Sequence, residues 1–317
     1  MLKSVSGIIF TFCVLVAFTP QSNTDPANEE QLGELLFFEP LLSADTTISC
    51  ATCHKPEFAF ADSVAISPGV KGALGRRNAP SVMNMAARDL MFYDGRAKDL
   101  IDQVHFPIED PVEMNISIIE VAQRLNQHPG YSTYFKKIYN EHANPQNISK
   151  AIAAYESSLE TSDTPFDDYM NGNKNAMTPS QIRGREVFMS KKAKCFDCHF
   201  SPDFTGDEFR NIGLYDEISR TDKGRYEVTG NKQDLGKFKV PGLRNVAVTA
   251  PYMHDGSMKT LREVIDYYDN PYAFVKHPIN IDSLLVTPLG LTEEEKSDLE
   301  SFLHALTDRR FTRPSLN

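Results

Sequence analysis

Two short stretches of the sequence carry cysteine and histidine at the same spacing. The first is ISCATCH at residues 48–54 and the second is AKCFDCH at residues 193–199. In a Cys-x-x-Cys-His pattern the two thiols form thioethers to the vinyl groups of a haem, and the adjacent histidine faces the iron. The pattern predicts two covalently bound c-type haems, the first on Cys50, Cys53 and His54 and the second on Cys195, Cys198 and His199.

The same residue types allow a second interpretation, a structural zinc site built from two Cys-x-x-Cys pairs. Such pairs usually lie about 15 to 20 residues apart. Cys53 and Cys195 are separated by the length of a whole domain, and each pair is followed by a histidine. The spacing therefore favours haem over zinc.

Composition and the N-terminus narrow the class of protein. The chain has 317 residues, a net charge of -10 and a pI near 5.3. It lacks the excess of basic residues that is typical of a nucleic-acid-binding protein, so this class is disfavoured. Residues 1–23 combine one lysine with a short apolar run, as in a secretory signal peptide. We expect export to the periplasm, with an uncleaved membrane anchor as the alternative. Apart from Cys13 in the apolar run, every cysteine belongs to a haem motif.

The elements that would position these motifs are helical. Apolar residues recur at helical spacing after the signal, over residues 117–160 and in the last segment, where Thr292 and Glu295 form a capping box. GELLF at 33–37 and GREVF at 184–188 each precede one haem motif, which indicates a tandem duplication. We predict a mostly α protein of two cytochrome c-like domains, each binding one covalent haem, at residues 24–165 and 166–317, with a turn-rich boundary at 161–175.

The function of a haem protein depends on the groups that face the open side of the iron. Gln103, His105 and Glu113 follow the first motif. A carboxylate over an open iron could move a proton between the two oxygens of a peroxide, as general acid–base catalysis requires. Taken alone, Glu113 reads more simply as a solvated surface carboxylate.

The motifs together resemble the bacterial di-haem cytochrome c peroxidase family, which includes MauG. The matching stretches occur in the family's order: ISCATCH, GRRNAPSVMN, FYDGRA, PVEMN, CFDCH, FKVPGLRNV and APYMHDG. The resemblance implies a peroxidatic haem at the first motif with Gln103 and Glu113 as catalytic residues, and an electron-transfer haem at the second. It also implies a small cytochrome c or cupredoxin as electron donor and a homodimer.

A calcium ion between the domains is a further implication of the resemblance. Its ligands would be Asn78 and the carbonyls of Thr249 and Pro251, and oxygen ligands suit calcium. From the residues alone, Asn78 before Ala-Pro reads more simply as a turn residue.

The chain departs from the family pattern in its axial ligands. Residues 55–104 contain no histidine to close the first haem, so this site is expected to be open. His105 is the only nearby substitute, and it reads more simply as a loop or surface histidine. The family's methionine ligand of the second haem is matched by Tyr268, as in MauG-like proteins. Tyr268 reads otherwise as a core tyrosine, with Met258 and Met253 as alternative ligands.

Tyr93 and His254 are two further residues to which the sequence assigns a role. Tyr93 stands where family members place a tryptophan between the haems, and the chain has no tryptophan. Tyr93 is therefore a candidate electron relay, with a packed aromatic as the alternative. His254 is expected to play a structural, hydrogen-bonding role.

The sequence leads to one function and two alternatives. The leading hypothesis is reduction of hydrogen peroxide to water with electrons from a small periplasmic redox protein. The first alternative is a MauG-like oxidase that uses peroxide to oxidise a protein or small molecule. The second is a di-haem electron carrier without catalysis, which requires that Glu113 is incidental.

Overall fold

The computed structural model describes residues 25–312, and the predicted signal peptide lies outside them. These residues form a mostly helical protein with one two-stranded antiparallel sheet. Within 25–312 no helix is both long and apolar enough to cross a membrane. The predicted mostly α fold class is therefore confirmed.

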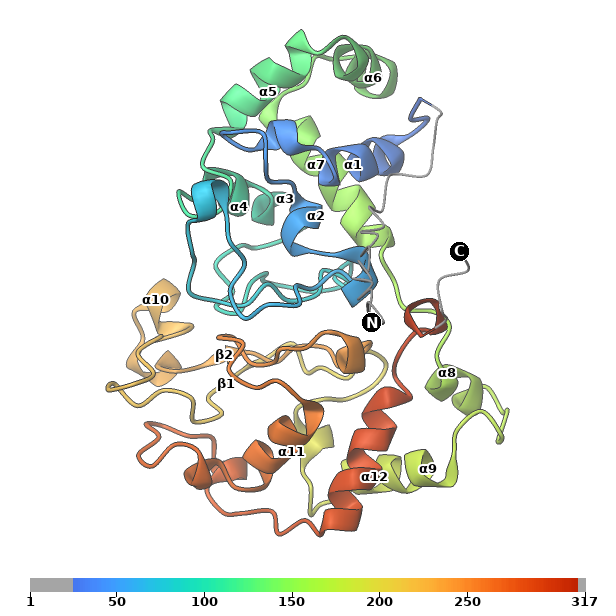
Figure 1. Ribbon diagram of the computed structural model, residues 1–317, viewed down its shortest axis with the longest axis vertical. Helices are drawn as coiled ribbons and strands as arrows, with labels where there is room; N and C mark the ends of the chain where they lie inside the picture. The colour runs from blue at the N-terminus through green and yellow to red at the C-terminus, as the bar shows by residue number, and fades with distance from the viewer. Residues whose placement is uncertain (1–24, 313–317) are drawn as a thin grey trace, which may run out of the picture.

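The first half of the chain lies above the second in the view of Figure 1. Its helices are α1 (Glu29–Phe37), α2 (Cys50–Cys53), α3 (Leu100–Gln103), α4 (His105–Glu109), α5 (Ile118–Gln127), α6 (Pro129–Tyr139) and α7 (Pro145–Ser158). The second half contains α8 (Pro165–Met170), α9 (Pro179–Phe188), β1 (Phe209–Arg210), α10 (Tyr226–Thr229), β2 (Phe238–Lys239), α11 (Leu261–Asp269) and α12 (Glu293–His304). The two strands lie between the halves.

Capping residues start the helices where the sequence predicts them. Thr178 and Gln181 form a capping box at the start of α9, with Pro179 in the first helical position. Thr292 and Glu295 do the same at the start of α12. The helix start predicted at Thr292 is confirmed.

Residues 117–160 are helical as expected and form three helices, because His128 and Asn144 cap new helices whose first residues are prolines. One local expectation needs correction. The turn-rich segment at 161–175 contains α8. Thr164 accepts a hydrogen bond from the backbone N–H of Asp167, and this cap starts a helix among residues that otherwise favour turns.

Each half is held together by a pair of crossing helices. In the first half α1 crosses α7, and in the second α9 crosses α12 (Figure 1). The crossing points are glycines: a Cβ on Gly33 would lie 1.8 Å from the carbonyl oxygen of Ala151, and one on Gly184 would lie 1.8 Å from that of Asp298. GELLF and GREVF thus supply the same close backbone approach in both halves.

Each half also has its own cluster of buried hydrophobic residues. One cluster runs from Leu32 to Leu159 and another from Phe166 to Leu306. The repeated crossing and the separate cores support the prediction of two tandem cytochrome c-like domains with a boundary near residue 165.

Ion pairs and backbone hydrogen bonds join the two halves. Arg77, which is mostly buried, makes a bidentate contact with Asp222 at 2.7 and 2.8 Å and a further contact with Asp94. The backbone N–H of Lys239 donates to the carbonyl of Tyr93 at 2.7 Å.

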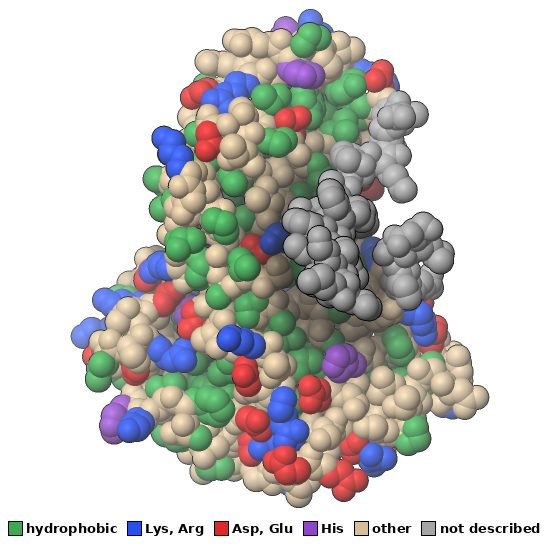
Figure 2. Space-filling model, in the orientation of Figure 1, with side chains coloured by type: hydrophobic (Ala, Val, Ile, Leu, Met, Phe, Trp, Pro, Cys, Tyr) green, Lys and Arg blue, Asp and Glu red, His purple; other side chains and the backbone are tan. Residues whose placement is uncertain are grey.

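Side chains of both charge signs are interspersed over the lower half of the face shown in Figure 2.

Candidate functional site

A cavity of about 830 Å³ lies beside the first cysteine motif. Its walls include α2, the segment after α2, α3, the loop after α4 and one face of α7. Glu227 and Val228 of α10 also line it, so the second half of the chain completes a cavity that belongs mainly to the first. A concave site of this size is typical of a bound ligand or cofactor.

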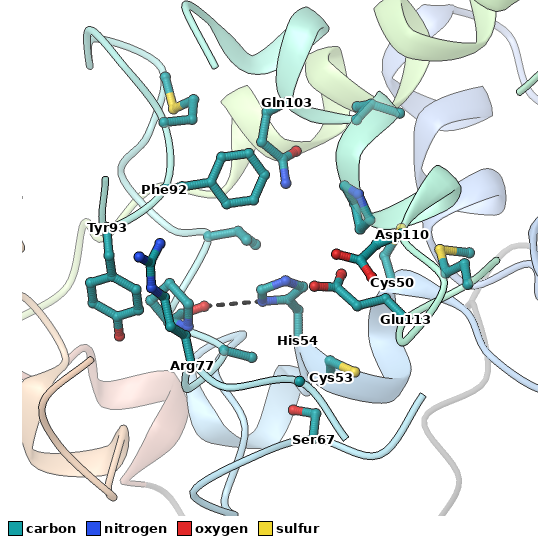
Figure 3. Close-up of a pocket in the computed structure, with 18 of the residues that line it drawn as sticks. Cys50, Cys53, His54, Ser67, Arg77, Phe92, Tyr93, Gln103, Asp110 and Glu113 are labelled. Carbon is teal, nitrogen blue, oxygen red and sulfur yellow. Dashed lines mark hydrogen bonds between the residues drawn. The ribbon is translucent and has the colours of Figure 1, made fainter. Parts of the chain in front are cut away.

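His54 projects into this cavity in a fixed orientation. Its Nδ1 lies 3.0 Å from the carbonyl oxygen of Pro80 and 3.2 Å from that of Phe60, and Figure 3 shows the ring in the middle of the cavity. Because carbonyls only accept, Nδ1 is the donor, which leaves Nε2 with a free lone pair. Burial lowers the pKa of His54, so the neutral form that ligates metals is favoured.

The two thiols beside His54 also line the cavity. Cys50 and Cys53 are free thiols, and burial raises the pKa of both. Two thiols on one turn of helix with a free imidazole nitrogen behind them match the donor set that attaches a c-type haem. The residues of this cavity therefore fit the predicted haem.

Gln103 and Glu113 meet at the same cavity. Gln103 comes from the end of α3 and Glu113 from the loop after α4, and both side chains point into the cavity in Figure 3. Burial, followed by the nearby charge of Asp110, raises the pKa of Glu113. Glu113 is thus not a solvated surface carboxylate, and it has the environment of a group that exchanges protons.

His105 does not reach the cavity wall. Its Nε2 lies 3.2 Å from the hydroxyl of Ser149 on α7, and it is not among the residues that line the cavity. This position speaks against His105 as a ligand of the first haem.

The second motif repeats the arrangement at a narrower cavity of about 170 Å³. Cys195, Cys198 and His199 line it, and His199 Nδ1 lies 2.9 Å from the carbonyl oxygen of Phe204. Burial lowers the pKa of His199 and raises that of Cys195 to about 12. The donor set again fits a c-type haem, and the other walls are mostly aliphatic.

Tyr268 lines this second cavity, whereas the two methionine alternatives do not. Within residues 25–312 no hydrogen-bond partner is found for its hydroxyl, although the neighbouring Tyr267 donates to the carbonyl of Ile212 at 2.6 Å. Met258 instead packs into a separate small core with Tyr267, and Met253 lies at its edge. Of the three candidates, Tyr268 alone is placed to meet a group bound at His199.

Tyr93 and His254 lie near the junction of the two halves. Tyr93 lines the first cavity, and burial raises the pKa of its hydroxyl. The ring of His254 stacks on Phe238 with centroids 3.8 Å apart, and its carbonyl accepts a hydrogen bond from the N–H of Asn78 at 2.8 Å. His254 therefore has the structural role expected of it, through its backbone and ring face.

Two of the predicted calcium ligands make side-chain hydrogen bonds of their own. The side-chain amide of Asn78 donates to the carbonyls of Val64 and Ala65, which leaves its oxygen as the available ligand atom. The hydroxyl of Thr249 donates to the carbonyl of Val246, and Pro251 follows a cis peptide bond. The calcium site stays a prediction.

The structure also places a residue at the first cavity that sequence reasoning missed. Glu156 of α7 lines the cavity next to the first motif, with an exposure of 3%. In the sequence it follows Ala-Ala-Tyr in a helix of mixed character, so only a helical register that puts Ile152 and Glu156 on one inward face could have indicated it.

The zinc alternative is not supported. The two cysteine pairs line different cavities, and among the residues that the structure describes no group of three or more His, Cys, Asp or Glu side chains is placed to hold a metal ion.

Comparisons with known proteins agree with this geometry. Residues 27–175 match the family model of the di-haem cytochrome c peroxidases. The chain is 37% identical over 293 residues to cytochrome c peroxidase Ccp of Escherichia coli, covering 90% of this chain but only 60% of that longer protein. It is 38% identical over 254 residues to the cytochrome c551 peroxidase of Nitrosomonas europaea, covering 79% of this chain and 74% of the relative.

A solved structure shows the same architecture. The crystal structure of a MauG-like protein associated with microbial copper homeostasis superposes with a TM-score of 0.82 at 32% identity, covering 94% of each chain. Sequence, fold and the two haem motifs agree, and the chain belongs to the di-haem cytochrome c peroxidase family.

Proposed function

We propose that the protein reduces hydrogen peroxide to water at the first cavity, with two electrons from a small periplasmic redox protein entering through the second. The observation that carries the proposal is the convergence of Gln103 and Glu113 on the cavity that His54 enters. A carrier without catalysis would have no use for a half-buried carboxyl and amide at a cavity of about 830 Å³.

The residues of the cavity have separate tasks in this proposal. Cys50 and Cys53 would attach the haem and His54 would ligate its iron, which would supply the redox chemistry. Glu113 takes the proton of one peroxide oxygen and returns it to the other, so that the second oxygen leaves as water. Gln103 donates a hydrogen bond that orients the peroxide. The overall reaction consumes two electrons and two protons and yields two molecules of water.

A steady-state assay tests the proposal. The holoprotein is mixed with a reduced small cytochrome c, and oxidation of the cytochrome is followed after addition of hydrogen peroxide. We expect two cytochromes oxidised per peroxide. Electron exchange with the cytochrome but no response to peroxide would instead identify an electron carrier.

A MauG-like oxidation of an organic substrate is the second candidate, and the position of Tyr268 favours it. A phenolate is a hard, anionic ligand that stabilises ferric and higher states, whereas a methionine thioether raises the potential. This candidate also has an open first site, because residues 55–104 contain no histidine.

The substitution Tyr268→Phe tests whether Tyr268 is an axial ligand of the second haem or only a packed core tyrosine. We expect the low-spin electron paramagnetic resonance signal of the second haem to change and its reduction potential to rise, while a high-spin signal from the first haem stays. Tyr267→Phe, which removes the neighbouring hydroxyl from its bond to Ile212, is the control. A second-haem signal that is indifferent to Tyr268→Phe would assign the ligand elsewhere.

A further inference from the structure

Glu156 is a buried carboxyl at the first cavity with no role in the proposed reaction. It lines the cavity from α7, and its Oε2 has no hydrogen-bond partner within the part of the chain that the structure describes. Buried polar atoms in native proteins almost always have partners, so an unpartnered one calls for an explanation.

Arg76, Arg77 and Arg96 line the same cavity, but no lysine or arginine of the described residues offsets the effect of burial on Glu156. Burial alone raises the pKa of Glu156 to about 8. The charge of Glu156 in turn raises the pKa of Cys50, which lines the same cavity. At neutral pH Glu156 therefore carries its proton.

Other ionisable groups lie on the elements packed around α7. They include Cys53 of α2, Glu29, Glu30 and Glu34 of α1, Asp99 and Asp102 at α3, His105 and Glu109 of α4, Glu113 after α4, and Glu120 and Arg124 of α5. Arg124 is engaged by Glu120 and the carbonyls of Leu41, Ser43 and Ala44. Once the haem is attached, Cys50 and Cys53 are thioethers and do not titrate, and the other acids that line the cavity are Asp94, Asp110, Glu113 and Glu227. Asp94 pairs with Arg77, Glu227 pairs with Arg76, and Asp110 accepts a hydrogen bond from the N–H of Val112.

A haem attached to Cys50 and Cys53 would present thioether carbon and sulfur atoms to this side of the cavity, and these atoms would donate no hydrogen bond to Glu156. Glu156 therefore stays an unpaired acid beside a redox centre. Loss of an electron from that centre adds one positive charge to the cavity, and a positive charge favours the ionised carboxylate.

We propose that Glu156 is the proton-holding residue of the first haem pocket. It carries a proton while the haem is reduced and releases it to solvent when a one-electron oxidant, such as ferricyanide or the second haem, takes an electron. This inference rests on the proposed function only in requiring a haem at Cys50 and Cys53. Its consequence is that the redox equilibrium of the first pocket depends on pH.

The sign of the dependence follows from linkage. Because the oxidised pocket prefers the ionised carboxylate, raising the pH favours oxidation and lowers the potential. The slope approaches about 59 mV per pH unit, the one-electron equivalent of a tenfold change in proton concentration. It applies between the pKa of Glu156 in the oxidised pocket and its higher pKa in the reduced pocket.

Spectroelectrochemical titration of the intact holoprotein between about pH 6 and about pH 9 tests the proposal. We compare wild type with Glu156→Gln, which keeps the shape and removes the proton, and with Glu160→Gln, which removes an exposed carboxylate from the segment after α7. We expect the reduction potential of the first haem to fall with rising pH in wild type and in Glu160→Gln. In Glu156→Gln we expect this dependence on pH to be lost. The second haem, in its own cavity, should not respond to either substitution.

A slope that persists in Glu156→Gln overturns the proposal, and its loss in Glu113→Gln alone would assign the proton to Glu113. Should Glu156→Gln fail to fold, redox-induced infrared difference spectroscopy of wild type decides. A protonated carboxyl band that disappears on oxidation supports the proposal, and its absence overturns it.

The same experiment keeps the two proposals apart. A slope lost in Glu156→Gln in a protein that does not turn over peroxide supports Glu156 and overturns the proposed function. Peroxide turnover together with a slope that survives the substitution does the reverse.

Discussion

Replacing Glu113 by glutamine should lower kcat for peroxide reduction by about 10²- to 10⁴-fold, the usual contribution of a positioned acid–base group. Glutamine preserves the size of the side chain, but it can neither take nor return a proton. Glu113 is half-buried at the cavity and its pKa is raised, which places its proton affinity closer to the working pH than that of an exposed glutamate.

The control for this substitution is Glu109→Gln. Glu109 is an exposed residue at the end of α4 whose side chain accepts a hydrogen bond from the N–H of Ile118, and a glutamine can still accept it. We expect wild-type turnover from this variant. Both variants should retain two haems by absorption spectroscopy, so that a loss of activity reports chemistry. Unchanged turnover in Glu113→Gln would remove Glu113 from the mechanism.

The haem motifs could be located from the sequence because their chemistry depends on local spacing. Cys50, Cys53 and His54 lie on one turn, and no distant residue is needed to recognise them. The helix caps at Thr178 and Thr292 were predictable for the same reason. Helix α8 was missed because one cap at Thr164 outweighs the turn residues around it.

Residues that act through long-range packing could not be assigned from spacing. Glu156 lies about a hundred positions after Cys50, and it reaches the cavity only because α7 crosses α1 beside the motif. The completion of the first cavity by Glu227 and Val228 likewise depends on how the two halves dock. For Gln103 and Glu113, the family resemblance supplied a role before the structure placed them together.

Because α1 and α7 cross closely at Gly33, we expect a single added methyl group there to have a large effect on stability. A Cβ there would lie 1.8 Å from the carbonyl oxygen and 2.6 Å from the carbonyl carbon of Ala151, both of them backbone atoms. No rotation of a side chain relieves this contact, so α1 and α7 must move apart. We expect Gly33→Ala to lower the free energy of unfolding by about 3 kcal/mol, the upper range for overpacking in a core.

A second glycine provides a control of opposite sign. Gly130 lies in the first turn of α6, where a Cβ would meet its nearest neighbour, His128 Cε1, at an ordinary 3.4 Å. Gly130→Ala should stabilise the protein by about 0.4 to 1 kcal/mol, because alanine loses less conformational entropy in a helix. Denaturant unfolding of the holoproteins measures both changes. Equal stabilities for the two variants would show that α1 and α7 do not approach as closely as the backbone places them.

The close crossing at Gly33 has a counterpart in the second half of the chain. Gly184 makes the same approach to Asp298 between α9 and α12, so Gly184→Ala should destabilise the second half by a similar amount. In both halves the glycine lies in the middle of the helix that precedes a Cys-x-x-Cys-His motif. A close crossing of the two helices fixes one wall of each cavity, and in the first half it brings α7, with Glu156, against the motif. A methyl group at either glycine should therefore disturb the spectrum of the haem in that half more than the other.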